Sequence, residues 1–180
     1  MYNKVVLKLS GEALGGDTGK SFDNNTIFSI IDQIKKIIEM GTKTTLVVGG
    51  GNFWRGRSAN PDMDRVKADQ IGMLATVMNA IYVADCFRQK GVEAVVMTPI
   101  KIGTVTEEFS KDLANKYLEE GKVIIFAAGI GHPFFSTDTV TALRACELEA
   151  DAILFAKAID GVYDSDPATN PDAKKFDEIP

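Results

Sequence analysis

The sequence of 180 residues is poor in the residue types that build disulfides and metal centres. It contains two cysteines and a single histidine. Cys86 and Cys146 lie far apart and form no CxxC pair, so the sequence indicates neither a disulfide framework nor a zinc site. Isolated thiols of this kind are typical of buried cysteines in a reducing compartment, and we therefore expect the protein to be cytoplasmic.

Excess positive charge and long hydrophobic runs are also missing. The formal net charge is −5 and the sequence pI is near 5.0, which argues against a general nucleic-acid partner. The N-terminal residues MYNKVVLKLSGEAL contain no long apolar run, so we expect no signal peptide. No stretch of about 18 uncharged apolar residues occurs, and we expect no membrane partner.

The remaining composition is that of an ordinary globular protein, with 45% hydrophobic and 25% charged residues. Apolar runs alternate with longer amphipathic segments along the chain. The expected strands are residues 4–10, 43–48, 92–97, 122–128 and 151–156, and the expected helices are residues 23–41, 62–90, 106–121 and 136–150. This rhythm predicts an α/β fold, a three-layer α/β/α sandwich with a mostly parallel central sheet, in one domain over residues 1–180.

Capping residues mark the limits of the first helix. Isoleucines recur at helical spacing within residues 23–41, either Asp23 or Asn25 can cap the start, and Gly41 can end the helix. Gly91 and Gly121 follow two further helices in the same way.

The helix expected at residues 62–90 is unusual. Residues 71–87, IGMLATVMNAIYVADCF, are apolar nearly all round, whereas a helix at a protein surface normally has one polar face. Two interpretations are open: deep burial within this domain, or one face on the sheet and the other on a second subunit. We favour the second, because helices that flank a parallel sheet usually face water on one side.

The chain ends with KKFDEIP, shortly after a strand and a loop rich in Asp, Asn and Pro. A proline is an unusual last residue for a finished domain. We therefore expect that more of the same domain follows Pro180 and that the C-terminal part of the fold is absent from this chain.

Two glycine-rich segments resemble nucleotide-binding loops but do not fit them. In GGDTGKS, residues 15–21, only three residues separate Gly15 from Gly19, one fewer than the P-loop pattern requires. We interpret this segment as a flexible surface loop. In GIGHPF, residues 129–134, Phe134 stands where a dinucleotide-binding loop has its third glycine, so that assignment is weak as well.

Glycines do follow several of the expected strands, and these form a stronger pattern. They are Gly11, Gly49, Gly50, Gly51, Gly129 and Gly131. Ligands of open parallel sheets bind outside the carboxyl ends of the strands. Glycine at that edge lets backbone amides approach an anion closely, and a following helix N-terminus adds positive potential. The pattern predicts a site for a polyanion, with tight turns as the simpler alternative.

Charged residues accompany these glycines. Lys8 is either an edge lysine that faces water or a point charge for a phosphate, and Arg55 can fork onto phosphate oxygens. Asp138 is either an ordinary first-turn acid of a helix or a carboxylate linked to Mg²⁺. A lysine, an arginine, backbone amides and a metal-tolerant acid are the groups that phosphoryl transfer uses.

Five segments in this order and spacing resemble the bacterial UMP kinases, a family of the amino acid kinase superfamily. They are KLSGEAL (8–14), GGGNFWRG (49–56), RVKADQIGMLATVMNA (65–80), GHPFFSTD (131–138) and DGVYDSDP (160–167). The resemblance covers the whole chain. It implies transfer of the γ-phosphoryl group of ATP to UMP in pyrimidine nucleotide biosynthesis, by a homohexamer that needs Mg²⁺, is activated by GTP and is inhibited by UTP.

The same resemblance implies roles for individual residues. The catalytic residues would be Lys8, Arg55 and Asp138. ATP would be bound by Lys8, Leu9, Ser10, Gly11, Gly51, Arg55, Tyr163 and Asp166. UMP would be bound by Gly50, Asp69, Ile130, Gly131, His132, Pro133, Phe134, Phe135, Ser136 and Thr137. The region that senses GTP would be Gly16, Asp17, Thr18, Gly19, Lys20 and Ser21. Mg²⁺ would be held mainly through the ATP phosphates, with Asp138 as a candidate ligand.

Some residues depart from the family pattern, and other functions remain open. The sequence before Gly161 differs from the pattern, so Lys157 is not carried over as an adenine contact, and Trp54 either packs or lines the site. We expect no general base at His132, because a UMP phosphate is already deprotonated near pH 7. The alternatives are a non-catalytic nucleotide sensor of the same fold and a kinase of the superfamily that acts on an amino acid or carbamate.

Overall fold

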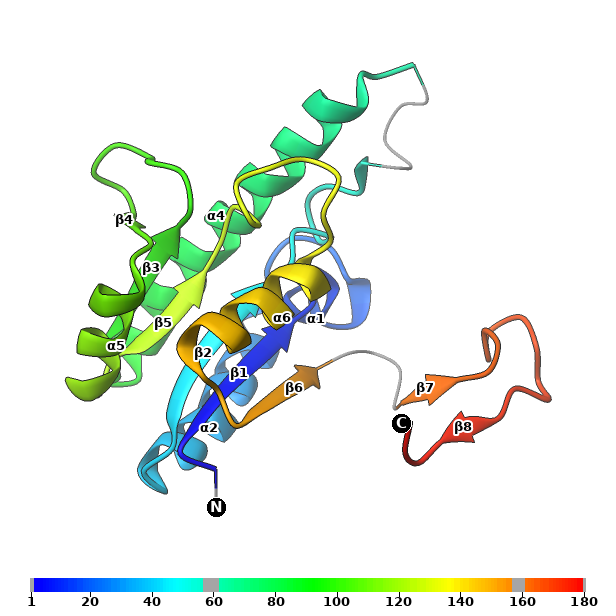
Figure 1. Ribbon diagram of the computed structural model, residues 1–180. Helices are drawn as coiled ribbons and strands as arrows, with labels where there is room; N and C mark the ends of the chain where they lie inside the picture. Colours follow the sequence, from blue (N-terminus) through cyan, green and yellow to red (C-terminus); the bar gives the residue numbers. More distant parts are fainter. Residues whose placement is uncertain (1, 57–61, 157–160, 180) are drawn as a thin grey trace.

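The computed structural model describes residues 2–56, 62–156 and 161–179 (Figure 1). Its strands are β1 (Lys4–Leu9), β2 (Lys43–Val48), β3 (Ala94–Thr98), β4 (Glu107–Glu108), β5 (Val123–Phe126), β6 (Ala152–Ala156), β7 (Val162–Tyr163) and β8 (Lys175–Phe176). Its helices are α1 (Gly11–Leu14), the 3-10 helix η1 (Gly16–Thr18), α2 (Asn24–Glu39), α4 (Arg65–Gln89), α5 (Lys111–Glu119) and α6 (Thr137–Leu148).

The central sheet has six strands in the order β4-β3-β5-β2-β1-β6, and all of its pairings are parallel. Strands β7 and β8 form a separate antiparallel pair, which lies beyond β6 in Figure 1. The prediction of a mostly parallel central sheet is therefore confirmed.

Two hydrophobic clusters show that helices cover both faces of the sheet. Along β2, Leu46 and Val48 belong to a cluster with α2 and α4, whereas Val47 between them belongs to a cluster with α5 and α6. Successive side chains of a strand point to opposite faces, so each face of the sheet has its own helical layer. Figure 1 shows α6 in front of the sheet and α2 behind it. The predicted three-layer sandwich is confirmed.

Capping residues set the helix ends as expected. Asp23 is the N-cap of α2, and its Oδ1 accepts a hydrogen bond of 2.7 Å from the backbone N–H of Thr26. Gly41 follows this helix with φ of 87°. No atom lies within 4 Å of the position that a Cβ would take at Gly41, so the backbone conformation alone accounts for glycine there.

The prediction of one helix over residues 106–121 is wrong at its start. Residues Glu107–Glu108 form β4 at the edge of the sheet, and α5 begins only after Ser110, its N-cap. The backbone N–H of Phe109 donates to the carbonyl of Thr98, 2.9 Å away, and the Phe109 ring packs edge-on against Phe126 at 5.6 Å. Pairing with β3 and burial of this ring outweigh the local helical pattern.

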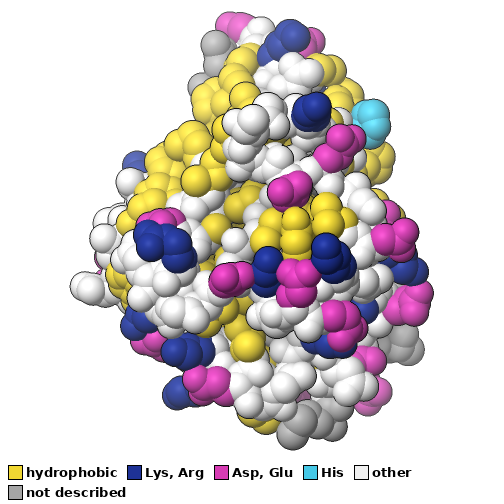
Figure 2. Space-filling view, turned by 90° about the vertical axis from the view of Figure 1, so that its left-hand side faces the viewer, with side chains coloured by type: hydrophobic (Ala, Val, Ile, Leu, Met, Phe, Trp, Pro, Cys, Tyr) yellow, Lys and Arg dark blue, Asp and Glu magenta, His cyan; other side chains and the backbone are white. Residues whose placement is uncertain are grey.

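Helix α4 is partly buried and partly exposed. Nine of its residues are buried against the sheet and α2: Ala68, Ala75, Thr76, Val77, Asn79, Ala80, Val83, Cys86 and Phe87. Large apolar side chains lie exposed on another side at Ile71, Leu74, Met78 and Ile81. The less favoured interpretation, deep burial on all sides, thus does not hold for this chain alone. Figure 2 shows a broad hydrophobic area on the upper part of the molecule.

By length and composition alone, α4 could also cross a membrane. Its apolar window has a mean hydropathy of 1.3 and is 44% buried. The core helix of a globular protein meets the same criterion, and α4 contacts β2, β3 and β5 of the sheet.

Candidate active site

Three strands end side by side at one edge of the sheet. Leu9, the last residue of β1, pairs with Val48 at the end of β2, and Val47 pairs with Phe126 at the end of β5. The glycines predicted to mark an anion site follow these strand ends. The parallel topology therefore brings the segments after β1, β2 and β5 to a single edge, called here the glycine rim and defined by residues 10–12, 49–55 and 127–138.

Glycine is required in the rim because two backbone turns touch there. A Cβ at Gly11 would lie 2.4 Å from the backbone nitrogen of Gly51. A Cβ at Gly50 would lie 3.0 Å from the carbonyl oxygen of Gly72 on α4. The contact at Gly11 is too short for any Cβ, and a Cβ at Gly50 would require α4 to give by a few tenths of an ångström, so glycine lets these turns lie against each other and against α4.

A buried amide pair, which the sequence reasoning missed, fixes the turn after β2. Asn79 of α4 donates to the carbonyl of Gly49 at 2.6 Å and to Oδ1 of Asn52 at 2.7 Å. Asn52 in turn donates to the carbonyl of Ser21 at 2.8 Å. The available signal was a single asparagine inside an otherwise apolar helix, since a buried polar side chain needs partners.

Helix α4 also supports the turn after β5. The hydroxyl of Thr76 accepts a hydrogen bond of 2.8 Å from the backbone N–H of Ala128. Ala128 and Gly129 have φ of 60° and 61°, so the chain leaves the sheet in the left-handed region. This turn explains why the strand predicted to reach residue 128 ends at Phe126.

Lys8 lies inside the sheet and faces a carboxylate. Strand β1 lies between β2 and β6, and only 7% of Lys8 is exposed, so the interpretation as an edge lysine is wrong. Its Nζ lies 3.1 Å from Oδ1 of Asp138. Asp138 stands in the first turn of α6, whose N-cap is Ser136, and 44% of the Asp138 side chain is exposed. The pair offers one buried cation and one accessible carboxylate at the rim.

Arg55 is held by a residue to which we assigned no role from the sequence. Its Nη2 lies 2.8 Å from Oε1 of Glu12 in α1. Glu12 belongs to the motif KLSGEAL, so its position directly after Gly11 was a signal in the sequence that it lies at the candidate site. Both side chains line a cavity of about 470 Å³ together with Gly51, Gly19 and Lys20.

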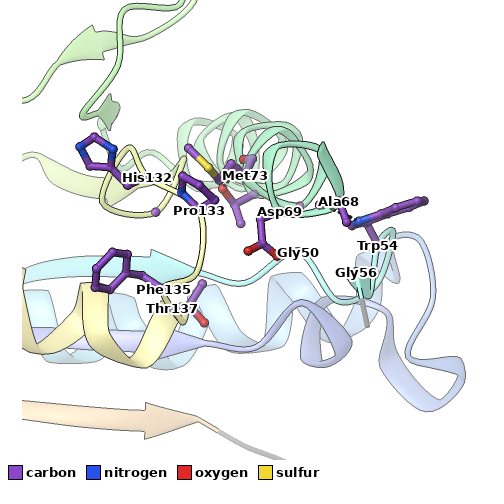
Figure 3. Close-up of a pocket in the computed structure, with 13 residues that line it drawn as sticks. Gly50, Trp54, Gly56, Ala68, Asp69, Met73, His132, Pro133, Phe135 and Thr137 are labelled. Carbon is purple, nitrogen blue, oxygen red and sulfur yellow. Dashed lines mark hydrogen bonds between the residues drawn. The ribbon is translucent and has the colours of Figure 1, made fainter. Parts of the chain in front are cut away.

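A second cavity of about 170 Å³ lies beside the rim (Figure 3). Its lining residues are Gly50, Trp54, Gly56, Ala68, Asp69, Gly72, Met73, Thr76, Gly129, His132, Pro133, Phe135 and Thr137. We call it the rim pocket. Trp54 and His132 lie at opposite ends of it in Figure 3. The Trp54 indole donates to the carbonyl of Ala68 at 2.8 Å, so this side chain both packs and lines the pocket.

The rim pocket contains some of the residues predicted to bind UMP and not others. Those that line it are Gly50, Asp69, His132, Pro133, Phe135 and Thr137. Ile130 packs instead against the cluster under α5 and α6, and Ser136 caps α6. Gly131 lies against Pro99 and Ile100. The loop 130–137 therefore contributes His132, Pro133, Phe135 and Thr137 to the pocket rather than a continuous wall.

Asp69 connects α4 to this loop. Its Oδ2 accepts a hydrogen bond of 2.8 Å from the backbone N–H of Phe134, and both of its oxygens accept from Nε of Arg65 at 2.9 and 3.0 Å. Phe134 itself has φ of 73° and its ring lies under the Arg65 guanidinium, 5.3 Å from it. These contacts hold the loop over the pocket.

Residues predicted to hold adenosine lie apart from this pocket. Tyr163 is in β7, and Asp166 lies in the turn that follows, where its Oδ1 accepts from the backbone N–H of Ala168 at 2.9 Å. Lys157 lies outside the described residues. The adenosine contacts stay a prediction.

The loop 16–21 is more structured than the flexible loop predicted. It contains η1, followed by Gly19 and Ser21 with φ of 62° and 59°. The backbone N–H of Ser21 donates to the carbonyl of Asn52 at 3.2 Å, which ties the loop to the turn after β2. No strand leads directly into it, in agreement with the rejection of a P-loop.

Within residues 2–56, 62–156 and 161–179, no group of three or more His, Cys, Asp or Glu side chains could hold a metal ion. In the described part of the chain, the carboxylate of Asp138 pairs with Lys8 at the rim.

Comparison with known proteins identifies the family of this chain. The model of the amino acid kinase family matches residues 3–180. The chain belongs to the amino acid kinase family. Among solved structures it is similar to UMP kinase from Bacillus anthracis, with 40% identity and a TM-score of 0.90 over 97% of this chain and 72% of that one. It is also similar to UMP kinase from Ureaplasma parvum, with 38% identity and a TM-score of 0.91 over 99% of this chain and 77% of that one.

Proposed function

We propose that this amino acid kinase family member transfers the γ-phosphoryl group of ATP to UMP, giving UDP and ADP, in pyrimidine nucleotide biosynthesis. The observation that carries the proposal is the rim pocket, which gathers Gly50, Asp69 and Thr137 beside the Lys8–Asp138 pair. Two UMP kinases of known structure, at 38–40% identity, support the same assignment.

The cations of the rim supply what the transfer requires. Phosphoryl transfer is accelerated mainly by positioning the reactants and by neutralising charge on the transferring group. Lys8 brings a buried positive charge to the rim, and Arg55 brings a planar guanidinium that can fork onto phosphate oxygens. The acceptor is a phosphate rather than a hydroxyl, so no side chain has to remove a proton.

Glycines and loops bind the two nucleotides. On the ATP side, the segment Leu9, Ser10 and Gly11 and the residue Gly51 offer backbone amides to the phosphates. On the UMP side, Asp69 binds the ribose and the loop 130–137 surrounds the uridine. The hydrogen bond between Asp69 and Phe134 keeps this loop over the pocket, where it excludes water.

The donor set at the rim fits a magnesium ion that arrives with ATP. Mg²⁺ usually keeps several waters and binds through one or two carboxylates together with substrate phosphates. Asp138 is the carboxylate that pairs with Lys8 among the described residues, and 44% of its side chain is exposed. When bound, Mg²⁺ would supply charge neutralisation at the phosphates, and Asp138, which pairs with Lys8, would offer it an oxygen.

The protein assembles as a homo-oligomer, a hexamer, in the cytoplasm. The apolar residues Ile71, Leu74, Met78 and Ile81 are spaced by three or four positions on α4, so they form one stripe that a second copy can cover. GTP activates and UTP inhibits, and the loop 16–21, tied to Asn52 of the rim, carries the GTP response.

A coupled assay of ADP release tests the function on the full-length protein with ATP and Mg²⁺. UMP, CMP, aspartate, acetylglutamate and carbamate are offered in parallel. We expect turnover with UMP alone. Turnover with an amino acid or carbamate would replace UMP by that acceptor. Binding of UMP without turnover of any acceptor would favour a nucleotide sensor.

A further inference from the structure

A carboxylate lies among the groups that face the phosphates, where a negative charge is least expected. Glu12 directly follows the glycine of the turn after β1, and its Oε1 lies 2.8 Å from Nη2 of Arg55. A carboxylate near a phosphate site repels the phosphate unless a cation separates the two charges. The transfer reaction itself gives this side chain no task.

The Glu12 carboxylate lies against the backbone of the rim. A Cβ at Gly51 would lie 2.1 Å from Oε1 of Glu12, so the carboxylate takes the space that a side chain at position 51 would fill. A Cβ at Gly19 would lie 3.7 Å from the Cβ of Glu12. Glu12 therefore lies against the turn after β2 and lines the same cavity as Gly19 of the loop 16–21.

A contribution to stability explains this arrangement poorly. The Arg55 side chain is 65% exposed and the Glu12 side chain is 35% exposed, and ion pairs this open to solvent contribute little to folding. A pair that is weak in free energy can still set the direction of a long side chain. It can also exchange one partner for another at low cost, which suits a guanidinium that must engage a phosphate.

We propose that Glu12 is a positioning residue, which holds the Arg55 guanidinium over the Gly51 turn until a phosphate replaces the carboxylate as its partner. The proposal rests on the proposed phosphoryl transfer. Glu12 touches neither nucleotide and acts only through Arg55. In the free protein the carboxylate pairs with Nη2 of Arg55, and in the complex the phosphate takes its place.

Two opposite effects follow for ground-state binding when Glu12 loses its charge. Arg55 is no longer aimed at the rim, which weakens phosphate binding, and the repulsion between carboxylate and phosphate disappears, which strengthens it. In the transition state, the aim of the guanidinium matters most. Glu12→Gln should therefore lower kcat, whereas the KM for ATP changes little.

A double-mutant cycle tests this on the full-length enzyme. Four proteins are compared: wild type, Glu12→Gln, Arg55→Ala and the double variant. We expect Glu12→Gln to lower kcat about 10-fold, with the KM for ATP within about threefold of wild type and an unchanged melting temperature. In the Arg55→Ala background, Glu12→Gln should not lower kcat further, since residues that act as a unit are not additive.

Glu119→Gln is the matched control, because it breaks a surface pair with Lys43 at 2.6 Å that lies outside the rim. It should leave kcat and KM at the wild-type values. An equal fall in kcat on adding Glu12→Gln to wild type and to Arg55→Ala would overturn the proposal, as would wild-type turnover of Glu12→Gln.

A second readout does not depend on turnover. Phenylglyoxal modifies accessible guanidinium groups, and mass spectrometry measures its rate at Arg55. Without its carboxylate partner, Arg55 should react several times faster in Glu12→Gln than in wild type or Glu119→Gln. Equal rates in all three proteins would refute the positioning role. A different outcome separates the two proposals. If wild type does not turn over UMP but phenylglyoxal modifies Arg55 faster in Glu12→Gln, the proposed function is rejected and the positioning of Arg55 by Glu12 is retained.

Discussion

The two cations of the rim are held in opposite ways. Lys8 lies in a central strand, with Val47 and Phe155 opposite it in the neighbouring strands, and only 7% of the residue is exposed. Arg55 lies in the loop after β2 with 65% of its side chain exposed. Each faces a carboxylate from the start of a helix: Asp138 for Lys8 and Glu12 for Arg55.

This contrast points to two different tasks. A buried lysine in the sheet has its position fixed by the core before any ligand arrives, and packed interiors resist displacement. An arginine on a loop can follow a group that moves during the reaction. We infer that Lys8 supplies the fixed part of the electrostatic field and Arg55 the part that adapts to the phosphoryl group in transfer.

The largest effect should come from the fixed cation. Lys8→Ala removes a charge that no other side chain can replace, and kcat should fall by on the order of 10³. Lys8→Arg should not restore activity, because a guanidinium does not fit the space of a buried ammonium between β2 and β6. The measurement is kcat in the ADP-release assay.

Arg55→Lys is the matched exchange for Lys8→Arg. Because Arg55 lies on an exposed loop, this variant should retain a measurable fraction of the wild-type kcat. Equal tolerance of the two exchanges would contradict the division between a fixed and an adaptable cation.

The partner of the fixed cation should come next. Asp138→Asn keeps the shape of the side chain and removes its charge, so Lys8 loses its partner and the proposed Mg²⁺ would lose one oxygen ligand. We expect kcat to fall about 10²-fold, with half-maximal activity at a higher Mg²⁺ concentration. Titration of activity with Mg²⁺ measures both quantities. An unchanged Mg²⁺ dependence with a lower kcat would restrict Asp138 to the orientation of Lys8.

Much of the contrast between Lys8 and Arg55 could be predicted from the sequence, because local sequence patterns determine the strands and helix ends of the parallel sheet that positions both residues. Apolar runs gave the strands and glycines gave the helix ends, as Gly41 with its φ of 87° illustrates. Once the sheet is parallel, the carboxyl ends of its strands must meet at one edge. The position of Lys8 and Arg55 at a common rim therefore followed from topology alone.

The parts that were missed depend on contacts between distant segments. Residues 107–109 are extended because Phe109 packs against Phe126, which no local pattern reveals. The Asn52–Asn79 amide pair and the Arg55–Glu12 ion pair join residues far apart in the chain. A glutamate in the first turn of a helix has an ordinary explanation, so its sequence position alone does not single it out.

A smaller effect is expected at the wall of the rim pocket near Arg55. Trp54 is the only tryptophan, and its indole lines the pocket while donating to Ala68. Trp54→Ala should raise the KM for UMP about 10-fold and leave the KM for ATP within about twofold. The substitution removes an apolar surface of the rim pocket but no charge that could bind a phosphate.

Tyr2→Ala, which removes an aromatic side chain that is 57% exposed, is the control for loss of an exposed ring. Steady-state kinetics with each nucleotide varied in turn measure the two constants. An unchanged KM for UMP would limit Trp54 to packing against α4.

The smallest effect is expected at the only histidine, at the other end of the pocket. His132 lies exposed, and in Figure 3 its ring points away from Asp69. His132→Asn should leave kcat within about threefold of wild type, because a phosphate acceptor needs no general base. The profile of kcat against pH should keep its shape for the same reason. A fall in kcat close to that of Lys8→Ala would show that proton transfer limits the reaction, and neither the fixed nor the adaptable cation would then suffice to explain catalysis.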